Sequence, residues 1–234
     1  MKCGIVGLPN VGKSTLFNAL TKAGIAAENY PFCTIEPNVG IVEVPDPRLG
    51  RLAGIAQPQK VIPAVVEFVD IAGLVAGASK GEGLGNKFLA GIRESDAIVF
   101  VLRAFDDGDV PGPADPLEHL RVVEIELTLA DLETVESQIG KKRKAAKNDP
   151  SIRAEVDALE AALTFLEDGT PLYRSSLKES DRLALKSSFL LTNKPVLAVV
   201  NVGEDQIDDI PSVIAPVEAE LGDTAEVIGV CVQL

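Results

Sequence analysis

The chain of 234 residues lacks the features of disulfide-rich and membrane-spanning proteins. Its three cysteines, Cys3, Cys33 and Cys231, are scattered and form no C-x-x-C pair, so neither a disulfide framework nor a zinc site is indicated. No apolar run reaches the roughly 18 residues that span a bilayer, and the N-terminus lacks the pattern of a secretory signal. We therefore expect a protein of the reducing cytoplasm that does not enter a membrane.

Basic residues are also scarce, since 22 Lys and Arg stand against 35 Asp and Glu and the formal net charge is −13. A general nucleic-acid coat needs a net basic face, so this class is excluded, although a local basic patch is not. Hydrophobic residues make up 46% of the chain, enough for a sizeable core. Disorder of the whole chain is therefore excluded. The length fits one large domain, or a domain that carries an insertion.

Short apolar runs alternate with helical patterns through the first hundred residues and again near the end. They predict a helix at 14–23 and strands at 3–6, 39–44, 65–69, 97–102, 196–200 and 225–230. Wholly apolar strands are typical of a parallel sheet covered on both faces, and their alternation with helices gives the α/β class. A helix would normally cover the last strand, so we expect the sequence to be a fragment of a longer protein.

A different pattern occupies about 116–191, where apolar residues recur at steps of three and four in two series. Asp149-Pro150-Ser151 lies between the series and is typical of a helix start. We predict an antiparallel helical hairpin of the coiled-coil type, inserted at 121–190 between two parts of the α/β domain, 1–120 and 191–234. The series are Leu120, Val123, Leu127 and Ala130, then Ile152, Val156, Leu159, Leu163 and Leu166.

Residues 7–14 match the phosphate-loop motif G-x-x-x-x-G-K-S in full, between a predicted strand and a predicted helix. Glycines let successive backbone N–H groups point at phosphate oxygens, and the helix adds the positive end of its dipole. Lys13 is predicted to reach the β- and γ-phosphates, and the Ser14 hydroxyl to bind Mg²⁺. A plain glycine turn is the alternative, which the full motif in this context disfavours. The predicted phosphate-binding residues are Asn10, Val11, Gly12, Lys13, Ser14 and Thr15.

Two further segments are expected to complete the phosphate and metal site. Asp70-Ile71-Ala72-Gly73 follows the strand 65–69, so Asp70 is predicted to face the magnesium ion through water and the Gly73 N–H to meet the γ-phosphate. Thr34 lies in a loop-like segment and is predicted to close over Mg²⁺ when the γ-phosphate is present, an ordinary loop threonine being the alternative. The predicted catalytic residues are Lys13 and Gly73, and the predicted metal ligands are Ser14, Thr34 and Asp70.

These motifs together resemble the G1, G2 and G3 elements of translation-factor-class P-loop GTPases. More narrowly, residues 7–15, 30–35 and 70–74 resemble the YchF branch of the Obg family, the Obg-like ATPases, as do 80–89 and 127–132. The resemblance covers essentially the whole chain. It implies a GTPase-like nucleotide-binding domain with a coiled-coil insertion, and a C-terminal TGS domain that this chain lacks. It also implies a link to ribosomes and to stress responses.

The segment expected to read the base departs from N-K-x-D, the pattern that selects guanine. At the matching strand end the chain has Asn201, then Val202 in place of lysine, and Glu204 in place of aspartate. Glu204 is one methylene longer and Val202 is expected only to pack on the base, so guanine pairing is weakened and ATP becomes plausible. The resemblance agrees, because the YchF branch carries N-x-x-E and favours ATP. At 231–233 the backbone of Cys231 and its neighbours is expected to touch the base; a polar strand-to-helix cap is the alternative for Asn201 and Glu204.

Turnover is expected to be slow, because Leu74 stands where Ras-like enzymes carry a glutamine that orients water. Relatives commonly have a histidine in the loop after the strand 97–102, but 105–111 contains none, and Asp109 is one alternative. We expect His119, the only histidine, to be a surface residue of a helix. In some relatives an asparagine at the position of Asn10 helps bind K⁺; K⁺ is therefore expected to accelerate turnover unless Asn10 is simply a turn residue.

A basic cluster near the tip of the predicted hairpin is the one local exception to the acidic composition. It is predicted to touch ribosomal RNA, although a solvated helix end would look the same. The predicted protein is a monomeric, Mg²⁺-dependent hydrolase of ATP or GTP that acts as a ribosome-linked switch. The alternative is a nucleotide-binding scaffold with negligible catalysis. The cluster comprises Lys141, Lys142, Arg143, Lys144 and Lys147.

Overall fold

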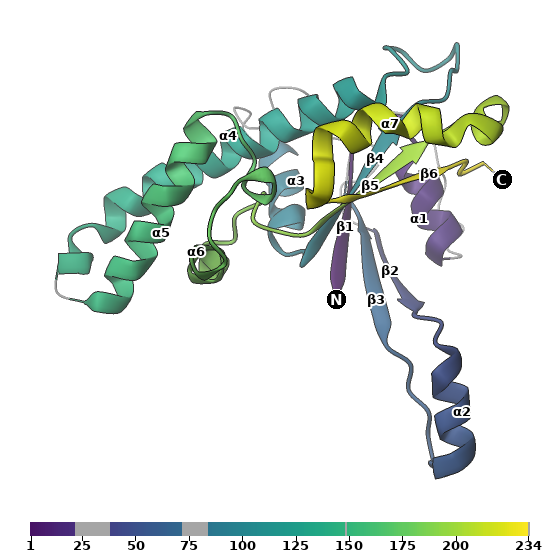
Figure 1. The fold of residues 1–234 in the computed structure, drawn as a ribbon, viewed down its shortest axis with the longest axis horizontal. Helices are drawn as coiled ribbons and strands as arrows, with labels where there is room; N and C mark the ends of the chain where they lie inside the picture. The colour runs from purple at the N-terminus through teal and green to yellow at the C-terminus, as the bar shows by residue number, and fades with distance from the viewer. Residues whose placement is uncertain (22–37, 72–83, 148, 234) are drawn as a thin grey trace.

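The computed structural model describes residues 1–21, 38–71, 84–147 and 149–233. Its centre is a six-stranded sheet in the order β2-β3-β1-β4-β5-β6 (Figure 1). Neighbouring strands are parallel, except that β2 is antiparallel to β3. The predicted α/β class with a mainly parallel sheet is confirmed, and each predicted strand agrees with an observed one to within a residue at either end. The strands are β1 (Lys2–Val6), β2 (Asn38–Glu43), β3 (Val65–Asp70), β4 (Ala97–Arg103), β5 (Val196–Asn201) and β6 (Glu226–Val230).

Helices cover both faces of the sheet, which explains why the central strands β4 and β5 are almost wholly apolar. Successive side chains of a strand point to opposite faces. In β4, Phe100 and Leu102 therefore join the core beneath α3, α4 and α7, whereas Val99 and Val101 join the core beneath α1. These helices are α1 (Lys13–Thr21), α3 (Leu84–Arg93), α4 (Pro116–Lys142) and α7 (Ile210–Leu221).

The connection between β2 and β3 extends away from the body as an arm with its own helix, α2 (Pro47–Ala56), which the sequence pattern did not predict (Figure 1). Asp46 caps this helix by accepting a hydrogen bond from the Arg48 N–H, and Pro47 occupies its first turn. No residue of α2 is buried, and Ile55 is 83% exposed. The helix therefore owes its ends to local capping and not to packing.

The insertion does not begin where the sequence pattern placed it. The series Leu120, Val123, Leu127 and Ala130 was predicted to belong to the hairpin, but all four residues pack in the core of the sheet. Only the second half of α4, from about Leu132, packs against α5 (Pro150–Glu167) in a separate core. A single 27-residue helix packs on the sheet with its first half and on α5 with its second half. Its periodicity alone does not show at which residue the sheet is replaced by α5.

The chain returns from α5 to the sheet through short helical turns. These are η3 (Leu172–Arg174), α6 (Glu179–Ala184) and η4 (Leu185–Ser188). The other short turns within the described ranges are η2 (Ala145–Lys147), η5 (Glu204–Asp209) and η6 (Gly222–Thr224). Asp131 of α4 is fully buried and holds the end of this return. Its carboxylate accepts hydrogen bonds from the backbone N–H groups of Leu191 and Thr192, each at 2.7 Å, and from the Thr192 hydroxyl.

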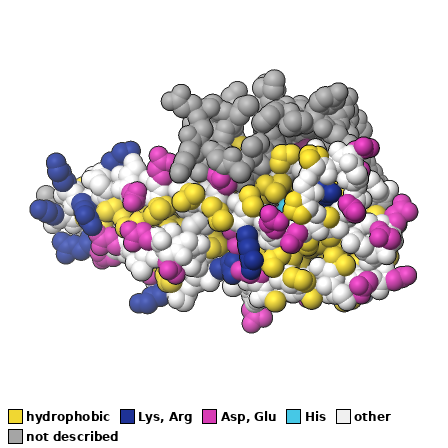
Figure 2. Space-filling view, turned by 90° about the horizontal axis from the view of Figure 1, so that it is seen from above, with side chains coloured by type: hydrophobic (Ala, Val, Ile, Leu, Met, Phe, Trp, Pro, Cys, Tyr) yellow, Lys and Arg dark blue, Asp and Glu magenta, His cyan; other side chains and the backbone are white. Residues whose placement is uncertain are grey.

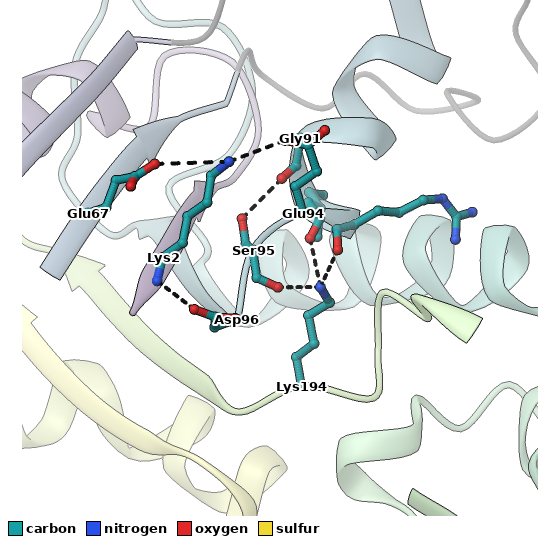
Figure 3. Close-up of polar contacts among 9 residues, drawn as sticks. Lys2, Glu67, Gly91, Glu94, Ser95, Asp96 and Lys194 are labelled. Carbon is teal, nitrogen blue, oxygen red and sulfur yellow. Dashed lines mark hydrogen bonds and ion pairs between the residues drawn. The ribbon is translucent and has the colours of Figure 1, made fainter. Parts of the chain in front are cut away.

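A second junction fixes the C-terminal end of α3 against the N-terminal ends of β1 and β5 (Figure 3). The Lys2 N–H, at the start of β1, donates to the Asp96 carboxylate at 2.8 Å. The Lys194 ammonium, just before β5, caps the end of α3, where cations are favoured by the helix dipole. Its acceptors are the carbonyls of Ile92, Arg93 and Ser95.

Within the described ranges, no helix has the length and apolar character needed to cross a membrane.

Candidate functional site

The phosphate loop, residues 7–12, leaves β1 and turns directly into α1. Asn10 and Gly12 have positive φ values of 60° and 96°, a conformation that favours glycine and tolerates asparagine. A Cβ atom on Gly12 would collide with the side-chain amide of Asn201, and one on Gly7 would collide with the Val101 carbonyl. The loop is therefore closed and tightly packed, and both glycines are required by their surroundings. Asn10 fits its turn position, and its role toward K⁺ stays a prediction.

Lys13 folds back over this loop. Its side chain is 7% exposed, and its ammonium donates to the Leu8 carbonyl at 2.6 Å. Burial lowers the pKa of Lys13 to about 8, against the opposing attraction of Asp70. Within the described part of the chain, Lys13 forms no ion pair. Among the described residues its ammonium is held by this one carbonyl, and a buried cation in such a position is suited to accept an anion.

Ser14 and Asp70 come together at the ends of adjacent elements, because β1 and β3 are neighbours in the sheet. The Ser14 hydroxyl donates to the Asp70 carboxylate at 2.7 Å, and Asp70 is almost fully buried. Burial raises the pKa of Asp70, while the Ser14 hydrogen bond and the charge of Lys13 act in the opposite direction.

This pair of oxygen donors fits Mg²⁺, which is commonly held by one or two protein ligands together with phosphate oxygens and water. The described residues include no group of three or more His, Cys, Asp or Glu side chains that could hold a metal ion.

Asn201 ties the end of β5 to the phosphate loop. Its side-chain NH₂ group donates to the Val11 carbonyl at 3.0 Å, and its side-chain oxygen accepts from the Val232 N–H at 3.3 Å. The segment after β6 is thereby held beside the loop, with Val232 buried and Cys231 half-buried. Asn201 thus joins three segments that are far apart in the sequence.

The prediction for Val202 is not supported, because its side chain has no surface to offer a base. Val202 is 1% exposed and belongs to the core beneath α7, together with Ala198 and Val200. The reason is the two-residue period of a strand, which places every second side chain of β5 on that face. Glu204, by contrast, is exposed at the start of η5.

Gln206 is a residue of this site that the sequence pattern did not reveal. Its side-chain amide accepts a hydrogen bond from the Gly203 N–H and donates one to the Ala104 carbonyl. No motif flags this glutamine, since Ala104 is 102 positions away and its closeness depends on β4 and β5 being adjacent.

Several predicted residues lie outside the described ranges. They are Thr34, Gly73, Leu74 and the resemblance segments at 30–35 and 80–83. Their predicted roles stay predictions.

His119 is not a surface residue as predicted, since it is 7% exposed. Its Nδ1 accepts from the Arg103 N–H at 3.3 Å, so its Nε2 carries the proton that faces the Pro113 carbonyl at 3.0 Å. Burial lowers its pKa, which favours this neutral form. The Arg103 side chain donates to the carbonyls of Phe105 and Val110. His119 and Arg103 therefore hold the loop after β4 in place, whereas Asp109 in that loop is exposed.

Comparison with known proteins agrees with this geometry. A family model described as 50S ribosome-binding GTPase matches residues 2–148. The chain belongs to this family. Within it, the chain falls in the YchF branch, as the resemblance implied. It is 52% identical to the ribosome-binding ATPase YchF of Haemophilus influenzae over 98% of its length, and 49% identical to that of Bacillus subtilis over 100%.

The solved structures contain a YchF relative of the same architecture. The YchF GTPase of Schizosaccharomyces pombe matches with a TM-score of 0.76 at 36% identity, over 99% of this chain and 65% of that one. The chain spans 64% of the Haemophilus protein and 66% of the Bacillus protein. What those longer proteins bind or do is therefore a matter of proposal for this chain.

Proposed function

We propose that this chain binds a nucleoside triphosphate together with Mg²⁺ and hydrolyses its terminal phosphate, with ATP preferred over GTP. The observation that carries the proposal is the closed phosphate loop, in which the buried Lys13 ammonium lies beside the Ser14–Asp70 pair. Backbone N–H groups of a glycine-containing turn at a helix N-terminus form a site for phosphate oxygens. A polyphosphate is the ligand that this combination fits best.

Each residue of the site is proposed to have a role that follows from its chemistry. Lys13 is proposed to bind the β- and γ-phosphates and to stabilise the charge that develops during transfer. Ser14 and Asp70 are proposed to hold Mg²⁺, directly and through water, and Thr34 to join them. The Gly73 N–H is proposed to contact the γ-phosphate. When bound, Mg²⁺ neutralises charge on the phosphate oxygens.

Preference for ATP rests on the turn at 202–204. Val202 is buried, and no lysine side chain stands at this position to lie along a guanine base. Glu204 is exposed and longer than the aspartate that guanine requires. The resemblance to the YchF branch and the printed name of the bacterial relatives, ribosome-binding ATPase, also support ATP.

Competition calorimetry with ATP and GTP in Mg²⁺ tests this preference. We expect ATP to bind at least about tenfold more tightly than GTP, a difference near 1.4 kcal/mol. Tighter binding of GTP would instead support a GTPase with a relaxed base site. If neither nucleotide binds, the proposal is wrong.

Turnover is proposed to be slow, because Leu74 is unable to orient water. A scaffold that binds nucleotide without hydrolysing it is the second candidate, and Leu74 is the observation that favours it. Phosphate release measured over hours separates the two. The proposed K⁺ contact at Asn10 requires release to be faster in K⁺ than in Na⁺, and equal rates would contradict it.

We also propose that the tip of the α4–α5 hairpin contacts ribosomal RNA. Lysine and arginine side chains gather at this end of the molecule (Figure 2). Lys142 pairs with Glu155 and Arg143 with Glu160. Across the described ranges, the remaining three cations of the cluster, Lys141, Lys144 and Lys147, form no ion pair. Exposed cations without an acidic partner are free to bind phosphate.

Reversing charge at the tip is expected to weaken ribosome binding. A Lys141→Glu/Lys144→Glu variant should co-sediment with purified 50S subunits at least about tenfold less tightly than the wild type, with a shallower salt dependence. The matched control is Lys60→Glu/Lys178→Glu, which reverses two exposed lysines outside the cluster. Equal loss in both variants would indicate a general charge effect and contradict the assignment to the tip.

A further inference from the structure

The turn that carries Glu204 is closed from both sides by one residue, Gln206. The Gln206 side-chain oxygen accepts from the Gly203 N–H at 2.8 Å, and the Gln206 backbone N–H donates to the Gly203 carbonyl at 3.0 Å. Glu204 and Asp205 lie between these two links and are exposed. The backbone of Glu204 is therefore held by its neighbours, while its side chain is exposed.

The same glutamine connects this turn to the loop after β4. Its amide nitrogen donates to the Ala104 carbonyl at 3.2 Å. The backbone N–H groups of Ala104 and Phe105 in turn donate to the backbone carbonyl of Asn201, at 2.8 and 3.2 Å. Because Asn201 also binds the phosphate loop through its side chain, these contacts form one path from the phosphate site to the turn at Glu204.

Gln206 supplies the side-chain part of this path. It is half-buried, and its amide uses both an acceptor and a donor on backbone groups. Removing one partner of such a hydrogen bond leaves the other unsatisfied. Without Gln206, nothing else in the described residues accepts from the Gly203 N–H or donates to the Ala104 carbonyl.

We propose that Gln206 is the positioning residue for nucleotide base recognition in this chain. By holding the turn, it sets where the Glu204 carboxylate stands relative to the phosphate loop, and so it controls both affinity for the base and discrimination between adenine and guanine. This inference rests on the proposed nucleotide binding. It assigns Gln206 no contact with the phosphates or with the reacting atoms.

A positioning role and a merely structural role differ in what they change. A mobile turn must be ordered when the base binds, which costs conformational entropy and lowers affinity for the whole nucleotide. Binding of the phosphates alone does not involve the turn. The comparison of a nucleotide with inorganic tripolyphosphate therefore isolates the role of Gln206.

The test is calorimetry on the Gln206→Ala variant with three Mg²⁺-loaded probes, namely ATP, GTP and tripolyphosphate. We expect ATP to bind about tenfold more weakly than to the wild type, as loss of two hydrogen bonds predicts. The ratio of ATP to GTP affinity should move toward one, and tripolyphosphate affinity should stay within twofold. Asp208→Ala is the matched control, since Asp208 is exposed on the same turn η5 and should leave all three affinities unchanged.

Three other outcomes would contradict the role of Gln206 or the proposed function itself. If the variant keeps the wild-type affinity for ATP and the wild-type ratio, Gln206 does not position the base. If tripolyphosphate binding falls as much as ATP binding, the effect is a general one on the fold and the inference is again wrong. If the wild type binds tripolyphosphate but neither nucleotide, the proposed function fails, and this inference fails with it.

Discussion

Replacing Lys13 with methionine is expected to slow nucleotide hydrolysis by at least about 100-fold, the size of effect seen when one donor to developing charge is removed. Methionine fills a similar volume but has no charge to offer the phosphates. The fold should survive, because the ammonium is buried at a cost in solvation that methionine does not incur. Loss of activity without loss of stability is the expected signature of a functional lysine.

The measurement is phosphate release at saturating nucleotide, together with thermal unfolding of the same preparation. Lys144→Met is the control, since Lys144 is an exposed lysine at the hairpin tip. Comparable phosphate release from wild type and the Lys13 variant would remove Lys13 from the mechanism. A large fall in unfolding temperature would show that the residue is mainly structural.

The same lysine should make nucleotide binding depend on pH. Its pKa is about 8 in the free protein, because burial disfavours the ammonium. A bound polyanion favours the charged form and raises this pKa. Affinity should therefore be constant below about pH 8 and fall as the pH rises above it, and the Lys13→Met variant should lack this fall. Calorimetry between pH 7 and 9.5 measures the difference.

Replacing Asp131 with alanine is expected to lower the free energy of unfolding by about 3–5 kcal/mol, because several buried donors lose their acceptor at about 1–3 kcal/mol each. The carboxylate accepts three hydrogen bonds where the insertion rejoins the sheet. Alanine would leave the N–H groups of Leu191 and Thr192 buried without their acceptor, and each such group costs about 1–3 kcal/mol. The loss should appear as a fall in unfolding temperature of the whole molecule, because α4 packs on both the sheet and α5.

Denaturant unfolding followed by circular dichroism measures this effect. Glu133→Ala serves as the control, since Glu133 is exposed two residues further along the same helix. A change below about 1 kcal/mol in the Asp131 variant would contradict the assigned role. A second, separate unfolding transition of the insertion would show that α4 does not couple the two cores.

The elements that could be predicted are those whose signal is local. Each strand buried on both faces is an uninterrupted apolar run, and the phosphate loop is a contiguous string between a strand and a helix. Helix α2 was missed because its ten residues contain two glycines and no buried side chain, so its apolar pattern is weak. The first half of α4 was assigned to the hairpin because the helix keeps one apolar periodicity while it packs first on the sheet and then on α5.

Among the site residues, too, those with a local signal could be predicted, and those that depend on packing could not. Lys13 and Ser14 were identified from their own motif, whereas the burial of Val202 and His119 depends on elements packed over them. Gln206 carried no signal at all, because its partner Ala104 is distant in the sequence.

The sequence by itself determined the α/β class, the phosphate loop and the family, since each of these depends on residues that are close together along the chain. Only the tertiary structure decided that Ser14 meets Asp70, 56 positions away, and that Asn201 reaches the Val11 carbonyl across 190 positions. These contacts exist because β1 lies between β3 and β4, with β5 beyond β4, so that the ends of these strands converge on one loop. Strand order is a property of the packed sheet, and no local pattern encodes it.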